Sequence, residues 1–201
     1  MIKTILSDMG NVILPFDISV FLKRIAKYSS MGIKELMDIP VLPDGLIESF
    51  GKGRISPEEY FMGMKEIFKV NITFKDFLDI YCSIFSLDSS VLETLAKLKG
   101  KNKLILLSNT DTLHFNYIKK RFPEIFIFDE YILSYKVGSV KPEERIFKIA
   151  IEKSEAEPEC ILFIDDMEEN IRAAERTGMK TIHFNSQTDL EAEMGKFGIS
   201  F

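Results

Sequence analysis

Residues 3–13 read KTILSDMGNVI, a short apolar run that ends at a lone carboxylate, Asp8. The run is too short for a free-standing helix, and it has the continuous apolar character of a strand buried on both faces of a parallel sheet. In open α/β sheets, ligands bind beyond the carboxyl ends of such strands. The opening segment therefore predicts a type of strand and the edge of the sheet where functional residues collect.

Four later segments repeat or approach this pattern. Buried strands are predicted at 103–109 (KLILLSN), 160–166 (CILFIDD) and 180–185 (KTIHFN), with a weaker one at 131–135 (YILSY). Helical patterns alternate with them at 89–100, 112–122, 143–154 and 168–178. The first and last of these end on Gly100 and Gly178, which favours C-caps there. This alternation indicates the α/β class, with a parallel sheet covered on both faces.

One segment breaks the alternation. Between about residues 16 and 87 the sequence lacks strand-like runs of that quality, and helical patterns occur instead at 18–28, 33–39, 57–68 and 74–85. We therefore expect a core domain formed by residues 1–15 and 88–201, with residues 16–87 inserted as an all-helical cap. The hinges would be the short segments LPFD and SLDSS.

The composition limits the partners. A chain of 201 residues with 46% apolar content can bury a core, and a net charge of -5 lacks the basic excess that nucleic-acid binding requires. The two cysteines, Cys82 and Cys160, stand far apart and fit reduced thiols. The sequence shows neither a signal-peptide pattern nor an apolar run of about 18 residues. We expect a cytoplasmic protein that binds no nucleic acid and no membrane.

Polar side chains follow the predicted strands. They are Asp8 after the first, Ser108 and Asn109 after the second, Asp165 and Asp166 after the fourth, and Lys141 in the loop after the weak strand. Because parallel strands end at one edge of a sheet, these residues should converge there.

The carboxylates of this set indicate a cation site. Asp8 and Asp166 would face each other from two strand ends, and hard anionic oxygens suit a small octahedral cation, which indicates Mg²⁺. A carboxylate beside a metal can attack phosphorus and form an aspartyl-phosphate, so Asp8 is the candidate nucleophile.

The remaining members of the set can donate to phosphoryl oxygens. Ser108, the backbone N–H groups around Asn109, and Lys141 are the candidate donors. Lys141 precedes a proline suited to the first turn of a helix, so its charge and the helix N-terminus would act on one anion. Each residue alone also fits a structural role, as a helix cap, a turn former or a solvated lysine. Their joint order and position favour a functional site.

The arrangement resembles the haloacid dehalogenase superfamily. The segments DMGNV, SNT, VKPEERIF and DDMEEN are similar to its four motifs, occur in its order and span the whole chain. The resemblance implies a Rossmann-like three-layer core with a C1-type helical cap. DMGNVI, GRISPEEYF, SNTDTLH, FPEIF and KPEERIF further resemble the bacterial α-D-glucose-1-phosphate phosphatase branch, which also has glycine in place of the second aspartate of the first motif.

The resemblance implies roles for the metal-site residues. Asp8 would be both nucleophile and metal ligand, and the Gly10 carbonyl would be a second ligand. Asp166 would bind Mg²⁺ directly, and Asp165 would help through water.

The resemblance also implies the roles of the phosphate site. Ser108 and Asn109 would hold the phosphate, and Lys141 would neutralise the nucleophile and the phosphoryl group. The activity implied is that of a Mg²⁺-dependent phosphatase acting on a small phosphorylated metabolite.

Gly10 departs from the usual pattern, because most phosphatases of the superfamily carry an aspartate there that protonates the leaving oxygen. Loss of such an acid removes a factor of about 10² to 10⁴ in rate. The chain should then favour sugar 1-phosphates or similarly activated esters. Asp17 and His114 are alternative proton donors, although structural roles suit both better, and His183 ends the last strand away from the motifs.

Two other functions stay open. The protein could bind a phosphorylated metabolite without turnover, because the acid is missing. It could instead be a 2-haloacid dehalogenase, which also uses a single aspartate in the first motif, although that branch normally has an aromatic residue at the position of Gly10 and does not depend on Mg²⁺.

Overall fold

The computed structural model describes residues 1–39 and 45–201. Its strands are β1 (Thr4–Ser7), β2 (Lys103–Ser108), β3 (Glu130–Leu133), β4 (Ile161–Asp165) and β5 (Lys180–His183). Its helices are α1 (Ile18–Ile25), α2 (Ile33–Met37), α3 (Leu46–Gly51), α4 (Pro57–Phe68), α5 (Phe74–Tyr81), α6 (Ser89–Ala96), α7 (Thr112–Arg121), α8 (Ser134–Val137), α9 (Glu144–Ser154), α10 (Glu168–Arg176) and α11 (Leu190–Gly195).

The five strands form one parallel sheet in the order β3-β2-β1-β4-β5. β1 is the central strand, and Thr4 is aligned with Lys103 of β2 on one side and Ile161 of β4 on the other. Its apolar residues Ile5 and Leu6 are fully buried, which is why the first run of the sequence has no alternation of polar and apolar residues. The central position brings Asp8 to the middle of the carboxyl edge.

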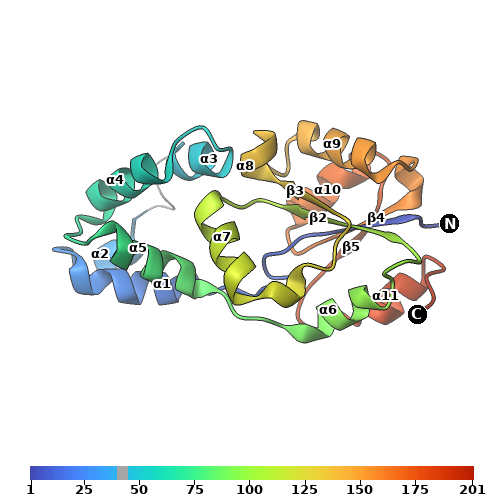
Figure 1. Ribbon diagram of the computed structural model, residues 1–201, viewed down its shortest axis with the longest axis horizontal. Helices are drawn as coiled ribbons and strands as arrows, with labels where there is room; N and C mark the ends of the chain where they lie inside the picture. The colour runs from blue at the N-terminus through green and yellow to red at the C-terminus, as the bar shows by residue number, and fades with distance from the viewer. Residues whose placement is uncertain (40–44) are drawn as a thin grey trace.

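Helices cover both faces of the sheet, as Figure 1 shows. Ile5 of β1 belongs to a core that includes residues of α6, α7 and α11. Its neighbour Leu6 points to the other face and belongs to a second core with residues of α9 and α10. The predicted three-layer α/β core with a parallel sheet is confirmed.

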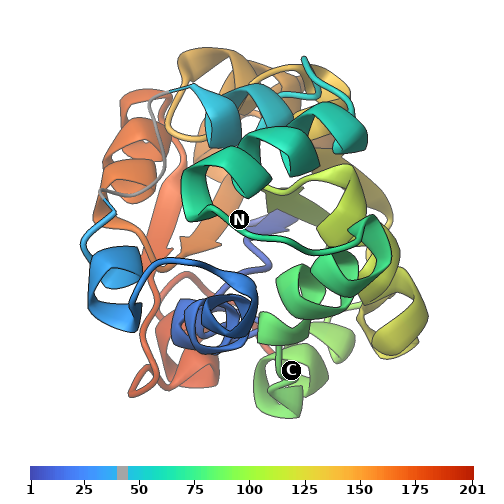
Figure 2. The ribbon, with the colours of Figure 1, turned by 90° about the vertical axis from the view of Figure 1, so that its left-hand side faces the viewer.

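A third hydrophobic core lies apart from the sheet. Residues of α1 to α5 form it, among them Phe21, Leu36, Phe50, Tyr60 and Phe77. Figure 2, which turns this end of the molecule toward the viewer, shows the blue to green helices in front of the sheet. We call α1 to α5 the cap, and its boundaries at residues 16 and 87 remain a proposed division of the chain.

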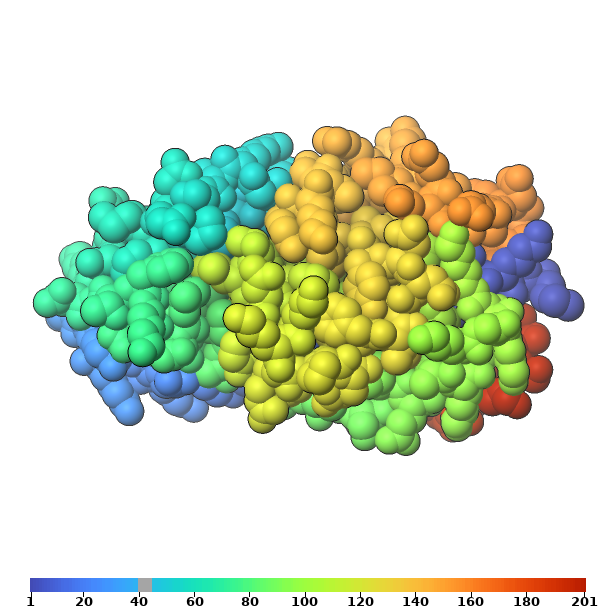
Figure 3. All heavy atoms as spheres, in the orientation of Figure 1, coloured from blue at the N-terminus to red at the C-terminus, as the bar shows by residue number. Residues whose placement is uncertain are grey.

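The cap lies beyond the carboxyl ends of the strands, at one end of an elongated molecule (Figures 1 and 3). The chain enters and leaves it through two adjacent segments, because Phe16 and Phe85 form an antiparallel bridge and the Ser86 N–H donates to the Pro15 carbonyl over 2.9 Å. The cap therefore faces the sheet edge where the predicted site residues lie.

Two local predictions need correction. The weak strand starts at Glu130, and Ser134 already begins α8, because the chain turns into a short helix directly after the fourth strand residue. Gly178 follows the end of α10 with φ 92° as predicted, whereas α6 ends at Ala96 and Gly100 belongs to a later turn.

The cap also contains a helix, α3, that the sequence patterns did not predict, because its six residues are too few to show a helical period. No helix in the described ranges is long and apolar enough to cross a membrane.

Candidate active site

A buried lysine lies between two carboxylates at the carboxyl edge of the sheet. Asp8 follows β1 and Asp165 ends β4, while Lys141 comes from the loop before α9. The Lys141 Nζ is 2.8 Å from Asp8 Oδ1 and 2.6 Å from Asp165 Oδ2. The side chains of all three residues are largely or fully removed from solvent. The fold thus brings together three residues that lie far apart in the sequence.

Burial and mutual charge set the protonation of this group. Burial raises the pKa of Asp8 to about 6, against the opposing effect of the Lys141 ammonium. Burial by itself would lower the pKa of Lys141, but the carboxylates of Asp8 and Asp165 raise it above its ordinary value. The lysine therefore stays cationic while Asp8 becomes ionised near neutral pH.

The third carboxylate, Asp166, completes a cluster. Ligand oxygens of Asp8, Asp165 and Asp166 lie within 4.8 Å of one another. Lys141 supplies a single positive charge to these three carboxylates, so a divalent cation would complete the neutralisation. This donor set of hard oxygens fits Mg²⁺.

The two aspartates at the end of β4, Asp165 and Asp166, differ in how many hydrogen bonds their carboxylate oxygens accept. Asp165 Oδ2 accepts from Lys141, and its Oδ1 accepts from the Met167 N–H at 2.8 Å and the Asn170 side chain at 2.9 Å. Asp166 Oδ2 accepts from Asn11 at 3.0 Å, and within the described ranges its Oδ1 has no protein donor. Asp166 is therefore the more available carboxylate for a cation.

Asp8 and Gly10 also keep free oxygens. Asp8 Oδ1 accepts from Lys141 and from the Met9 N–H at 2.7 Å, whereas Oδ2 has no protein donor among the described residues. Within the same residues, the Gly10 carbonyl accepts no hydrogen bond. Each of the predicted direct ligands, Asp8, Gly10 and Asp166, thus has an oxygen that is available to a cation.

The predicted phosphate-site residues take unequal positions. Ser108 ends β2 and is buried, and its hydroxyl has no hydrogen-bond partner in the part of the chain that the structure describes. The side chain of Asn109 instead forms two hydrogen bonds with the backbone of Lys141: it accepts from the N–H at 2.7 Å and donates to the carbonyl at 2.8 Å. The Asn109 side chain therefore holds the lysine loop in place, and its backbone N–H remains the candidate donor to an anion.

The loop of Lys141 also differs from the prediction that Pro142 lies in the first turn of a helix. Pro142, which follows through a cis peptide bond, precedes the N-cap residue Glu143, and α9 begins only at Glu144. Lys141 consequently lies three residues before the first residue of α9, and Pro142 is not in the first turn of that helix.

Two further residues join Asp166 in space. Asn11, in the segment DMGNV, donates to the Asp166 carboxylate, a role that the sequence analysis missed. His183 was expected away from the motifs, yet its Nε2 lies 2.9 Å from the Asp166 carbonyl. The reason is the parallel pairing of β4 with β5, which sets His183 opposite Asp165.

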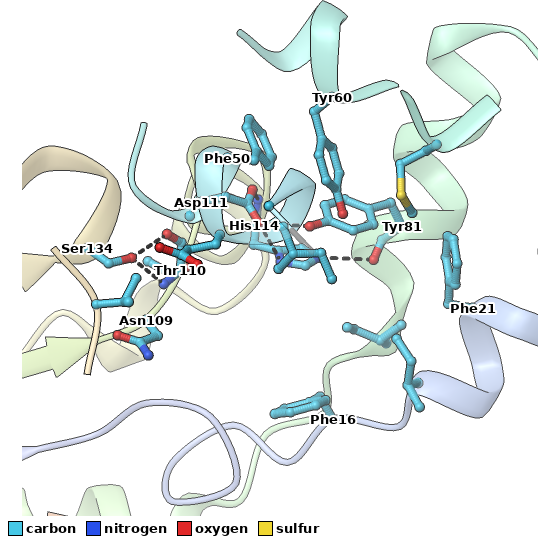
Figure 4. Close-up of a pocket in the computed structure, with 18 residues that line it drawn as sticks. Phe16, Phe21, Phe50, Tyr60, Tyr81, Asn109, Thr110, Asp111, His114 and Ser134 are labelled. Carbon is cyan, nitrogen blue, oxygen red and sulfur yellow. Dashed lines mark hydrogen bonds and ion pairs between the residues drawn. The ribbon is translucent and has the colours of Figure 1, made fainter. Parts of the chain in front are cut away.

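A cavity of about 520 Å³ opens between the cap and the core. Aromatic residues such as Phe16 and Phe50 line it together with the core residues Asn109 and Thr110 (Figure 4). Val140, which precedes Lys141, also lines it. The cavity thus adjoins the carboxylate and lysine site and has room for the non-phosphate part of a small ligand.

One wall of the cavity holds a network between cap and core. Tyr81 donates its hydroxyl to Asp111 Oδ2 at 2.9 Å, and His114 Nδ1 lies 2.9 Å from the same oxygen (Figure 4). The His114 ring stacks on Tyr81, with centroids 3.9 Å apart, and its Nε2 lies 3.2 Å from the Tyr81 carbonyl. His114 and Tyr81 hold the Asp111 pKa below its ordinary value, although burial acts in the opposite direction.

These contacts bear on the two alternative proton donors. Both ring nitrogens of His114 are engaged in this network. Asp17 caps α1 by accepting from the Ser19 N–H at 2.8 Å. Both contacts are of the structural kind that the sequence analysis favoured for these residues.

Comparisons with known proteins give a family match and several similar proteins. The family of haloacid dehalogenase-like hydrolases matches residues 2–178. A D-ribitol-5-phosphate phosphatase of Bacteroides thetaiotaomicron is 24% identical, over 96% of this chain and 97% of its own.

Two solved structures are similar along their whole length. One is a HAD family enzyme of Bacteroides thetaiotaomicron in complex with magnesium and inorganic phosphate, with a TM-score of 0.85 and 28% identity over 96% of this chain and 99% of that one. The other is described as a predicted HAD-like family hydrolase of Porphyromonas gingivalis, with a TM-score of 0.82 and 25% identity over 100% of both chains.

Proposed function

The chain belongs to the haloacid dehalogenase-like hydrolase family, and on this premise we propose that it is a Mg²⁺-dependent phosphatase of small phosphorylated metabolites, with Asp8 as the nucleophile. The observation that carries the proposal is the cluster of the buried residues Asp8, Lys141 and Asp165 with the half-buried Asp166. The similarity of the whole chain to a HAD family enzyme crystallised with magnesium and inorganic phosphate supports the choice of cofactor and ligand.

Binding of the phosphoryl group uses the polar residues around Asp8. The phosphoryl oxygens accept from the Ser108 hydroxyl, from backbone N–H groups near Asn109 and from the Lys141 ammonium. Asp8, the Gly10 carbonyl and Asp166 would hold Mg²⁺, which would supply further positive charge to these oxygens. Asp165 keeps Lys141 in position, because it receives the shorter of the two lysine contacts.

Two steps complete the reaction. The ionised Asp8 carboxylate attacks phosphorus, and the bond from phosphorus to the leaving oxygen breaks with its electron pair on that oxygen. Water then attacks phosphorus, releases inorganic phosphate and restores the Asp8 carboxylate. Lys141 remains protonated throughout and offsets the negative charge that develops on the phosphoryl group.

The nature of the leaving group follows from Gly10. Without an acid at this position, an anomeric oxygen departs more easily than a primary alkoxide. We therefore propose sugar phosphates, and sugar 1-phosphates in particular, as the first substrates to test. The D-ribitol-5-phosphate phosphatase named above supports a phosphorylated polyol or sugar as the general class.

The cap and the location of the enzyme belong to the same proposal. Residues 16–87 act as the cap that covers the substrate over the core formed by 1–15 and 88–201. A cytoplasmic location is supported by the two free thiols, Cys82 and Cys160, which fit a reducing compartment.

Asp8→Asn tests the assignment directly. The variant should lose phosphate release by at least about 10³-fold while it still folds, because the amide cannot attack phosphorus. The measurement is phosphate release from a panel of sugar phosphates, with and without Mg²⁺. Asp76→Asn, a change in the first turn of α5 in the cap, is the control and should retain activity.

Three results would contradict the proposal. Binding of a phosphorylated ligand without turnover by the wild-type protein would indicate a sensor, and halide release from a 2-haloacid would indicate a dehalogenase. Full activity in Asp8→Asn would remove Asp8 as the nucleophile.

A further inference from the structure

Gly10 lies against the ring of Phe16. A Cβ atom on Gly10 would be 3.1 Å from Phe16 Cε1 and 3.6 Å from Cδ1. The first separation is shorter than ordinary contact between carbon atoms at about 3.5 to 4.0 Å. The phenyl ring would therefore have to shift by a few tenths of an ångström to admit a Cβ atom at position 10.

Phe16 is held in this place from several sides. Its N–H donates to Asn11 Oδ1 at 3.4 Å, and the other end of the Asn11 amide donates to Asp166. Its ring meets Phe85 edge-on, with centroids 6.2 Å apart, in the second segment between cap and core. The position of the ring is thus tied to the carboxylate site and to both hinge segments.

The ring also faces the substrate cavity. Phe16 lines the cavity together with Asn109 and Val140, and 43% of the residue is exposed (Figure 4). Phe16 thus both approaches Gly10, two residues after Asp8, and lines the cavity. An apolar ring therefore stands on the side of Asp8 where a second aspartate would have carried the proton donor.

We propose that Phe16 is a specificity-determining residue, and this inference rests on the proposed phosphatase function. Together with Gly10 it puts an apolar surface in place of the proton donor. The enzyme then selects phosphate esters whose leaving oxygen departs as an anion, such as aryl, acyl or anomeric phosphates, and discriminates against esters of primary alcohols. The ring of an aryl group, or the C–H face of a sugar, packs on Phe16.

The pairing of Gly10 with Phe16 makes the acid hard to restore by one substitution. In Gly10→Asp the new carboxylate has to compete with the phenyl ring for the same space. In Gly10→Asp combined with Phe16→Ala the space is free, and the carboxylate can reach the leaving oxygen. The two positions should therefore act cooperatively on the choice of leaving group.

Two matched pairs of esters isolate the leaving oxygen: phenyl phosphate against benzyl phosphate, and glucose 1-phosphate against glucose 6-phosphate. Each pair keeps nearly the same organic group and changes the oxygen that departs. The wild-type enzyme with Mg²⁺ should prefer the first member of the pair that it accepts. The double variant should raise kcat on the second member by about 10²-fold, the lower end of the contribution of a general acid.

The single variants and a control test the role of the ring. Gly10→Asp alone should give less than about a tenth of that gain, and Phe16→Ala alone should give none and should raise KM for phenyl phosphate. Ile18 lines the same cavity and is 55% exposed, but it does not come within 4 Å of the position of a Cβ on Gly10. Gly10→Asp with Ile18→Ala should therefore behave like Gly10→Asp alone.

A thermal measurement tests the packing without any substrate. Gly10→Ala should lower Tm by about 2 to 4 °C in the presence of Phe16, because the added methyl group meets the ring, and should not lower it in Phe16→Ala. Equal shifts in the two backgrounds would overturn the inference.

The activity results separate this inference from the function on which it rests. A gain in Gly10→Asp alone that equals the gain of the double variant would overturn the role of Phe16 and leave the phosphatase function intact. Failure of the wild-type enzyme to release phosphate from any ester in the presence of Mg²⁺ would overturn both.

Discussion

At the scale of single residues, Lys141 holds the site together. It is the shared cation of Asp8 and Asp165, and its backbone is fixed by Asn109 through two hydrogen bonds. A buried charge that loses its partner is costly, so the lysine stabilises the folded protein as well as the phosphoryl group. The same residue thus serves folding and chemistry.

Lys141→Met should therefore abolish activity and destabilise the protein. It leaves two buried carboxylates without their cation, at a cost of about 3 to 5 kcal/mol in the free energy of unfolding. Thermal unfolding with and without Mg²⁺ measures this loss of stability. Mg²⁺ should reduce the difference in Tm between Lys141→Met and wild type, because it restores positive charge beside the carboxylates. Lys148→Met, in an exposed ion pair of α9, is the control and should change stability little. An unchanged Tm in Lys141→Met would contradict the argument.

At the scale of elements, the end of α5 is joined to the start of α7. Asp111 caps α7 by accepting from the N–H groups of Leu113 and His114, and it also accepts from Tyr81, the last residue of α5. The residue before Asp111 is the last of the SNT segment. The cap is thus attached to the core one residue beyond the candidate phosphate loop.

Tyr81→Phe should loosen this attachment. Removal of the hydroxyl deletes a hydrogen bond to a buried carboxylate, which is worth about 1.5 to 3 kcal/mol. Tm should fall, and KM should rise for esters that fill the cavity more than for acetyl phosphate, which is too small to need the cap. Tyr28→Phe, at an exposed tyrosine after α1, should leave both quantities unchanged. Equal effects on large and small esters would argue against a role in closing the cavity.

At the scale of the whole molecule, a second contact joins cap and core. Lys52, at the end of α3, forms ion pairs with Glu48 of the cap and with Glu143 of the core. Hydrogen bonds from Lys52 and Ser139 lower the pKa of Glu143 to about 2. This contact and the Tyr81–Asp111 hydrogen bond together tie the cap to the core at two places.

The contribution of the Lys52–Glu143 ion pair to stability should depend on pH. The folded pKa of about 2 lies below the ordinary value of 4.5, so the stabilisation is complete above about pH 4.5 and is lost as the pH falls toward 2. Glu143→Gln should unfold at lower urea concentration than wild type at pH 7, and the difference should shrink below about pH 4.5. Glu152→Gln, at an exposed glutamate of α9, should show no such trend. A difference that stays constant down to pH 3 would contradict the assignment.

From the sequence alone the class of fold could be predicted correctly, and the residues of the candidate site could be proposed. Apolar runs such as 3–8 and 160–166 predicted strands, and the polar residues after them marked the edge of the sheet where Asp8 and Asp165 now lie. These features depend on local periodicity and on chain order, which a single sequence records. The resemblance to a known family further predicted the Mg²⁺ cofactor and the phosphatase reaction. This was possible because each motif of the family is a short, contiguous segment of the sequence.

Which side chains meet could be read only from the folded chain. Asn11 and Asp166 lie 155 positions apart, and Asn109 and Lys141 lie 32 apart, so no local pattern could reveal either contact. The position of Phe16 over Gly10 likewise depends on how the hinge segments cross. Such contacts arise from the order of the strands and the placement of the cap, because folding brings distant segments together according to the packing of the whole chain.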